Sequence, residues 1–147
     1  MSSALHLVRR AIGSIDNRAP GPSSRAVAAG ILNAEQLVLW EAMAGRDRRH
    51  SLHVLRRFDR FAPGASGDER AAALLHDVGK TTSGLGWFLR VVATVVGPRG
   101  ERFRIYHGHE ETGARLISRC SSARTVQLVS GSATDHVAVA LRRADDI

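Results

Sequence analysis

A histidine and an aspartate stand side by side in the stretch AALLHDVGK, directly after a run of alanines and leucines. An ionised carboxylate in such apolar surroundings is costly unless an opposite charge neutralises it. A divalent cation supplies that charge, and imidazole nitrogen with carboxylate oxygen suits Zn²⁺, Mn²⁺, Fe²⁺ or, less readily, Mg²⁺. His76 and Asp77 are therefore candidate metal ligands. Taken alone, the dipeptide is more often a core histidine beside a helix-terminal aspartate.

A second histidine that could reach the same metal lies on the preceding predicted helix, from Arg48 to about Phe61. Projected at 3.6 residues per turn, its apolar residues share one face: Val54, Leu55, Phe58 and Phe61. His50 lies at the edge of this face, whereas His53 falls among arginines. His50 is therefore the better inward ligand. The alternative is a partly buried histidine that only packs.

The stretches RHSLHVLRRF, AALLHDVGKT, YHGHEETGARLI and ALRRADDI together resemble the successive motifs of the HD-domain superfamily of metal-dependent phosphohydrolases. The resemblance covers about residues 48–147. It implies a histidine on one helix, a His-Asp pair on the next and a distant aspartate on a late helix. In this chain the implied metal ligands are His50, His76, Asp77 and Asp145. Asp146 is the alternative to Asp145.

The resemblance also implies roles near the metal for Lys80 and His109. Lys80, the only lysine of the chain, occupies the position of the family's HDxGK motif. Its compact charge suits a phosphate, and a cation that complements the helix dipole explains it equally well. His109 matches the family's GHExxGA segment, as a second-metal ligand or a substrate and proton-transfer residue. His107 is its alternative, and His136 is either a further metal ligand or an exposed helix-start residue.

The implied activity is hydrolysis of a phosphoester, with a phosphomonoester or a nucleotide as substrate. A divalent ion of Mn, Fe, Co, Zn or Mg would orient the phosphate and lower the pKa of a water molecule that attacks phosphorus. The expected catalytic residues are Asp77, as metal ligand and base, with Lys80 and His109 offsetting charge on the phosphate. Nearby arginines, Arg115 being one candidate, would also offset this charge. The chain is thus predicted to be an enzyme, a metal-dependent phosphohydrolase.

The positive charge of the chain keeps a second function open. The formal net charge is +7 and the pI is about 11.3, which draws phosphates, nucleic acids or anionic lipids to the surface. The alternative is a non-catalytic, metal-stabilised module that binds nucleic acid or a nucleotide through arginines. The arginines are scattered along the sequence, and no zinc finger or RNA-recognition signature accompanies them.

Composition indicates a globular protein of the cytoplasm. The hydrophobic fraction of 44% argues against both disorder and a membrane protein. The longest apolar segment, residues 85–97, contains Arg90 and is too short to span a bilayer. The single cysteine, Cys120, cannot form an internal disulfide, which favours a reducing compartment.

Cap and turn signals predict an all-α bundle of about six or seven helices, without an alternating strand pattern. Residues 1–30 are expected to form a short helix and a flexible connector, with the loop at residues 13–25, and residues 31–147 the HD domain. Further helices are expected over residues 85–96, 108–120, 123–129 and from 136 onward. Capping boxes are predicted at Asn33 with Gln36 and at Ser66 with Glu69. Predicted N-caps are Asp47 and Asp135, and Gly79 is expected to end the His-Asp helix in a left-handed conformation.

Overall fold

The computed structural model describes residues 17–79 and 109–147 and shows seven helices and no strand within these ranges. They are α2 (Pro22–Ile31), α3 (Ala34–Ala42), α4 (Gly45–Phe61), α5 (Gly67–Leu75), α7 (His109–Ile117), α8 (Ala123–Val129) and α9 (His136–Asp145). The all-α prediction is confirmed. The predicted N-terminal helix, the helix over 85–96 and Lys80 lie outside the described residues. None of the described helices is long and apolar enough to cross a membrane.

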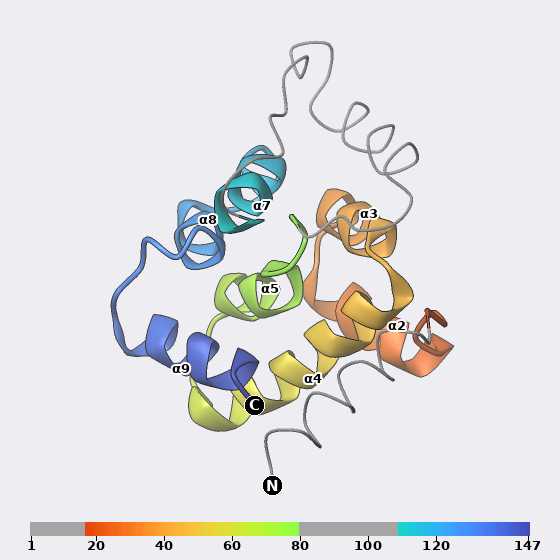
Figure 1. Cartoon of the computed structure of the whole chain (residues 1–147), viewed down its shortest axis with the longest axis horizontal. Helices are drawn as coiled ribbons and strands as arrows, with labels where there is room; N and C mark the ends of the chain where they lie inside the picture. The colour runs from red at the N-terminus through yellow and green to blue at the C-terminus, as the bar shows by residue number, and fades with distance from the viewer. Residues whose placement is uncertain (1–16, 80–108) are drawn as a thin grey trace, which may run out of the picture.

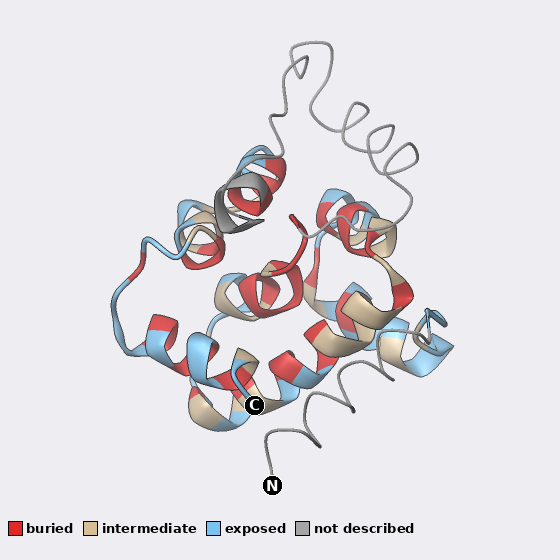
Figure 2. Ribbon diagram, viewed as in Figure 1, coloured by how far each residue is buried: buried red, intermediate tan, exposed pale blue. Residues whose placement is uncertain are grey.

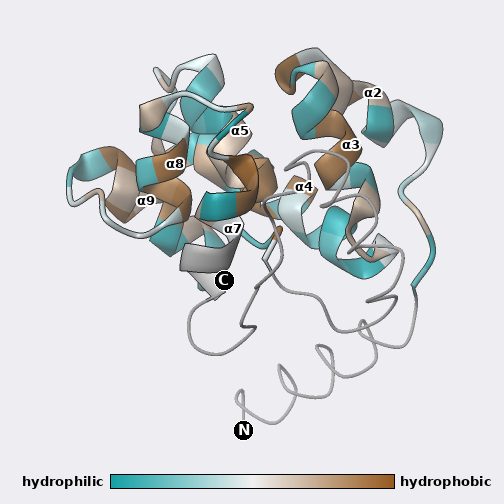
Figure 3. Ribbon diagram, turned by 90° about the horizontal axis from the view of Figure 1, so that it is seen from above, coloured by the Kyte–Doolittle hydropathy of each residue, from teal (hydrophilic) through white to brown (hydrophobic). Residues whose placement is uncertain are grey.

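Helix α5 forms the centre of the bundle (Figure 1). It packs against α4 and α8 and also contacts α2 and α3, while α4 packs against α9. Its residues from Ala71 to Leu75 are all buried, so the helix is red along this stretch in Figure 2. Other helices carry hydrophobic and hydrophilic residues side by side, as expected where one face meets the core (Figure 3). Because His76 and Asp77 directly follow this central helix, they lie in the interior of the bundle.

The predicted caps of α3, α5 and α9 are confirmed. In the capping box of α3, the Gln36 backbone N–H donates to Asn33 Oδ1 at 2.9 Å, and the Asn33 N–H donates to Gln36 Oε1 at 3.0 Å. Ser66 and Glu69 make the same reciprocal pair at the start of α5. The carboxylate of Asp135 accepts from the Ala138 N–H at the start of α9. Each cap contributes about 1 kcal/mol.

The predicted start of α4 is wrong by three residues. Its N-cap is Ala44, and Asp47 lies in the first turn, where its charge favours the helix dipole without capping it. The first residue of the helix is Gly45. The backbone of Asn17 and Arg18 passes so close to it that a Cβ at this position would collide with their carbonyl oxygens. Glycine is needed here for a contact with residues distant in the sequence, which the pattern within the helix does not show.

Two further boundaries differ from the prediction. The loop expected through Arg25 ends earlier, because α2 begins at Pro22, whose fixed φ suits the first position of a helix. The division of the chain at residue 30 stays a prediction. Helix α5 ends at Leu75, with His76 as its C-cap residue, so the stop expected at Gly79 is wrong. Among the described glycines, the left-handed conformation belongs to Gly131, with φ 72°.

Candidate metal centre

Three helices contribute the four predicted metal ligands to one place. His50 lies in the first half of α4, Asp145 is the last residue of α9, and His76 and Asp77 directly follow α5. Because α4 packs against both α5 and α9, it brings the two ends together. The positions of these residues follow from the packing of the bundle.

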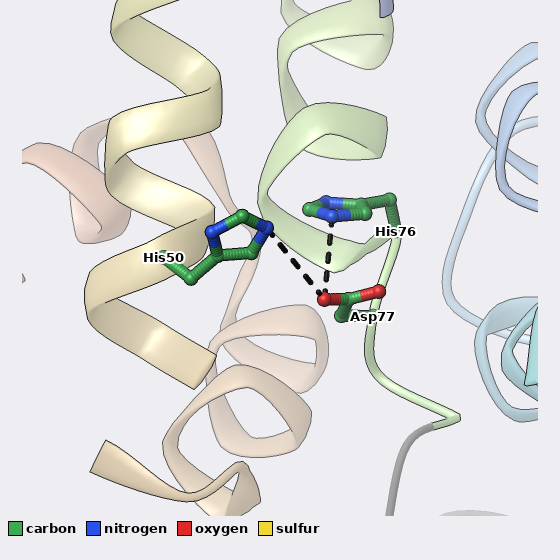
Figure 4. Close-up of side chains that lie close together, drawn as sticks. All are labelled: His50, His76 and Asp77. Carbon is green, nitrogen blue, oxygen red and sulfur yellow. Dashed lines mark ion pairs between the residues drawn. The ribbon is translucent and has the colours of Figure 1, made fainter. Parts of the chain in front are cut away.

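Asp77 lies between the two histidines (Figure 4). Its Oδ2 is 3.4 Å from His76 Nε2 and 3.9 Å from His50 Nε2. One ligand atom from each of the three residues falls within 4.8 Å of the others. Asp77 is also buried, with 6% of its surface exposed. A carboxylate at such depth requires compensating charge, which two imidazoles and a cation can supply.

Asp145 contacts the same two histidines from α9. Its Oδ1 accepts a hydrogen bond from His50 Nε2 at 2.9 Å and lies 3.3 Å from His76 Nε2. The neighbouring Asp146 is exposed. The structure therefore brings Asp145, and not Asp146, to the cluster. His53, also exposed, does not belong to the group of ligand atoms that lie within 4.8 Å of one another.

The end of α5 fixes the orientation of His76. Its Nδ1–H donates to the carbonyl of Ala73 at 2.8 Å, one of the carbonyls that a helix C-terminus leaves without an intrahelical partner. Its Nε2 then faces the two carboxylates, buried and without a hydrogen-bond partner among the described residues. A backbone carbonyl that holds one ring nitrogen while the other is directed at a metal is a common arrangement of metal-ligating histidine.

Charge dominates the cluster. Burial lowers the pKa of His76, but the carboxylates of Asp145 and Asp77 outweigh burial and raise it to about 10. The hydrogen bond from His50 and the contact with His76 hold the pKa of the Asp145 carboxyl well below its usual range, against the effect of burial. A metal ion binding here must displace the proton on His76.

Arg57 supports the cluster and was not found by sequence reasoning. Its Nη1 donates to the carbonyl of Ala144 at 3.0 Å and so ties the last turn of α9, next to Asp145, to α4. Arg57 follows His50 by seven residues, which is two helical turns on the same face. That spacing was the available signal, although the acceptor could not be known from it.

The structure does not place the remaining predicted residues at the cluster. Lys80 and His107 lie outside the described residues, and His109 begins α7 with a side chain that is outside them too. His136 is exposed at the first position of α9, opposite the end that carries Asp145. The two are about 13 Å apart along the helix axis at 1.5 Å per residue. This position favours the exposed helix-start interpretation of His136.

Comparison with known families agrees with this geometry. The model of the HD domain matches residues 48–145, more than half of the chain. This chain belongs to the HD-domain family. The HD match begins two residues before His50 and ends at Asp145, so it includes all four residues of the cluster. HD domains are commonly metal-dependent hydrolases, and the group His50, His76 and Asp77 fits a metal site. No curated protein and no solved structure matches the chain.

Proposed function

We propose that this HD domain hydrolyses the phosphoester of a phosphomonoester or a nucleotide. A divalent cation would be held by His50, His76, Asp77 and Asp145. The observation that supports the proposal most is His76 Nε2, a buried nitrogen without a hydrogen-bond partner among the described residues that faces two carboxylates 3.3 and 3.4 Å away. Buried polar atoms without a hydrogen-bond partner are rare in folded proteins, and a bound ion is one of the partners that accounts for them.

The donor set fits a divalent transition metal. Two imidazoles and two carboxylates balance a charge of +2, and this mixture suits Mn, Fe, Co or Zn better than Mg. When bound, the cation would polarise a phosphoryl oxygen and lower the pKa of a coordinated water. The protein orients these ligands before the cation binds. The carbonyl of Ala73 fixes the imidazole of His76, and the hydrogen bond from His50 fixes the carboxylate of Asp145.

Asp77 is proposed as the group that receives the proton of the attacking water. It lies in the cluster itself and is nearly closed off from solvent, so bulk water competes little for that proton. Lys80 is proposed to offset phosphate charge, since it follows Asp77 by three residues. His109, at the start of α7, is proposed to contact the substrate or transfer a proton to the leaving group. A cytoplasmic location stays a prediction from the single Cys120.

Substitution of Asp77 tests the proposal. We expect Asp77→Ala to lose both bound metal and turnover, because it removes a ligand and the proton acceptor together. Metal content is measured by elemental analysis, and turnover with a panel of phosphomonoesters and nucleotides in added Mn²⁺, Co²⁺, Zn²⁺ or Mg²⁺. Asp146→Ala is the matched control, since Asp146 is an exposed aspartate outside the cluster. An Asp77→Ala protein that hydrolyses the panel as fast as the parent refutes the assignment.

A further inference from the structure

Helix α4 presents a line of basic side chains on the side away from the core. Arg49, His53, Arg56 and Arg60 follow one another at spacings of four, three and four residues, which places them on one helical face. We call these four residues the basic stripe. His53, Arg56 and Arg60 are exposed, and Arg49 is half-buried. Three of the arginines that look scattered in the sequence thus share one face of α4.

Two members of the basic stripe, Arg56 and Arg60, keep their charge uncompensated by the described residues, whereas Arg49 donates to the backbone carbonyl of Arg18. Within the described part of the chain, Arg56 and Arg60 make no ion pair and no side-chain hydrogen bond. The acid of α4 beside the stripe, Asp59, is already engaged by both nitrogens of Arg70, each at 2.9 Å. Two arginines next to each other without an acid repel one another, so a bound anion would relieve this repulsion.

The pKa of His53 is consistent with a positive potential on this surface. Partial burial lowers its pKa, and the charges of Arg56 and Arg57 lower it further. An imidazole responds in this way where cations surround it and no carboxylate is near. Such a surface concentrates polyanions at moderate salt.

The length of the basic stripe indicates the kind of anion. From the first arginine to the last, it rises about 16 Å at 1.5 Å per residue. One nucleic-acid strand covers this length with about five nucleotides at 3.4 Å each, whereas a single phosphate needs only one or two arginines. The stripe contains no phenylalanine, tyrosine or tryptophan to stack on bases. We propose that the basic stripe docks the sugar–phosphate backbone of a nucleic-acid strand, independently of base sequence.

The basic stripe lies beside the metal cluster. Arg49 directly precedes His50, whose side chain is 39% exposed, so the cluster reaches the surface next to the stripe. A docked strand would therefore bring one of its phosphates to the cluster. This last step rests on the proposed hydrolysis, whereas the docking itself does not.

The docking is tested by fluorescence anisotropy of a labelled single-stranded oligonucleotide of about 20 nucleotides, with full-length protein in EDTA. Because no metal is present, the result is independent of hydrolysis. We expect the logarithm of the binding constant to fall linearly with the logarithm of salt concentration. Arg56→Gln with Arg60→Gln should weaken binding and reduce that slope by about 1.4, because each arginine that no longer meets a phosphate removes about 0.7.

The matched control is Arg119→Gln with Arg142→Gln. It removes the same charge from two exposed arginines outside α4, one after the end of α7 and one in α9. Equal weakening by both double variants would overturn the proposal, since it would show attraction by net charge alone. So would the absence of binding at about 50 mM salt. Stripe-dependent binding to phosphatidylserine vesicles but not to the oligonucleotide would overturn it as well. Circular dichroism of each variant establishes that it is folded.

Discussion

At the scale of single residues, the direction of one imidazole decides whether the cluster can hold a metal. The residue types predicted from the sequence, two histidines and two aspartates, do come together. What the sequence could not show is the hydrogen bond from His76 to Ala73, because it depends on where α5 ends. That bond leaves Nε2 as the nitrogen that faces Asp77 and Asp145.

Arg57 gives a prediction at this scale, because it contacts the backbone beside a proposed ligand and not the ligand itself. We expect Arg57→Met to lower the affinity for Mn²⁺ about tenfold, since groups that orient metal ligands are commonly worth that much. Titration calorimetry of metal-free protein measures the affinity. Arg56→Met is the control, because Arg56 is exposed and makes no hydrogen bond or ion pair with another described residue. An unchanged affinity in Arg57→Met would show that Ala144 needs no such support.

At the scale of helices, local signals were predictable and tertiary ones were not. The capping boxes at Asn33 and Ser66 join residues three apart, so a few consecutive residues are enough to predict them. The start of α4 depends instead on the backbone at Asn17 and Arg18, which no pattern within α4 reveals. The end of α5 was also not predictable from local residues: the sequence indicates a stop at Gly79, whereas the helix ends at Leu75.

Glu69 links two helices and gives a prediction for pH. Burial raises the pKa of its carboxyl, but hydrogen bonds from Ser66 and Arg124 outweigh burial and leave the pKa lowered. Its folded pKa is thus below the unfolded one. Glu69 therefore adds stability above about pH 4.5, its ordinary pKa, and this contribution is lost as the pH falls through the folded pKa.

Urea unfolding of Glu69→Gln and the parent, from pH 7 down to pH 3, tests this linkage. We expect the variant to be up to about 1 kcal/mol less stable at pH 7, because glutamine keeps the capping box but loses the charge that pairs with Arg124, and the difference to shrink below about pH 4.5. Glu35→Gln is the control, since Glu35 lies in the first turn of α3 without serving its capping box. A difference that is as large at pH 3 as at pH 7 would contradict the account.

At the scale of the whole molecule, the site depends on contacts between distant parts of the chain. His50 and Asp145 are 95 positions apart, so no local pattern could bring them together. The resemblance to a family indicated an aspartate on a late helix, and the apolar face that ends at Ala144 favoured Asp145, whereas His50 followed from the amphipathic pattern of its own helix. The helical projection already places His53 among arginines, but it could not show which of them stay exposed and without an acidic partner among the described residues.

The account's central claim is that these four side chains share one divalent cation. It is tested most directly by anomalous X-ray scattering from crystals of the protein soaked in Mn²⁺. We predict a single strong peak at about 2.0 to 2.4 Å from the nitrogens of His50 and His76 and from carboxylate oxygens of Asp77 and Asp145. A Mn²⁺ peak bound by other residues, or no peak at this cluster in fully soaked crystals, would contradict the claim.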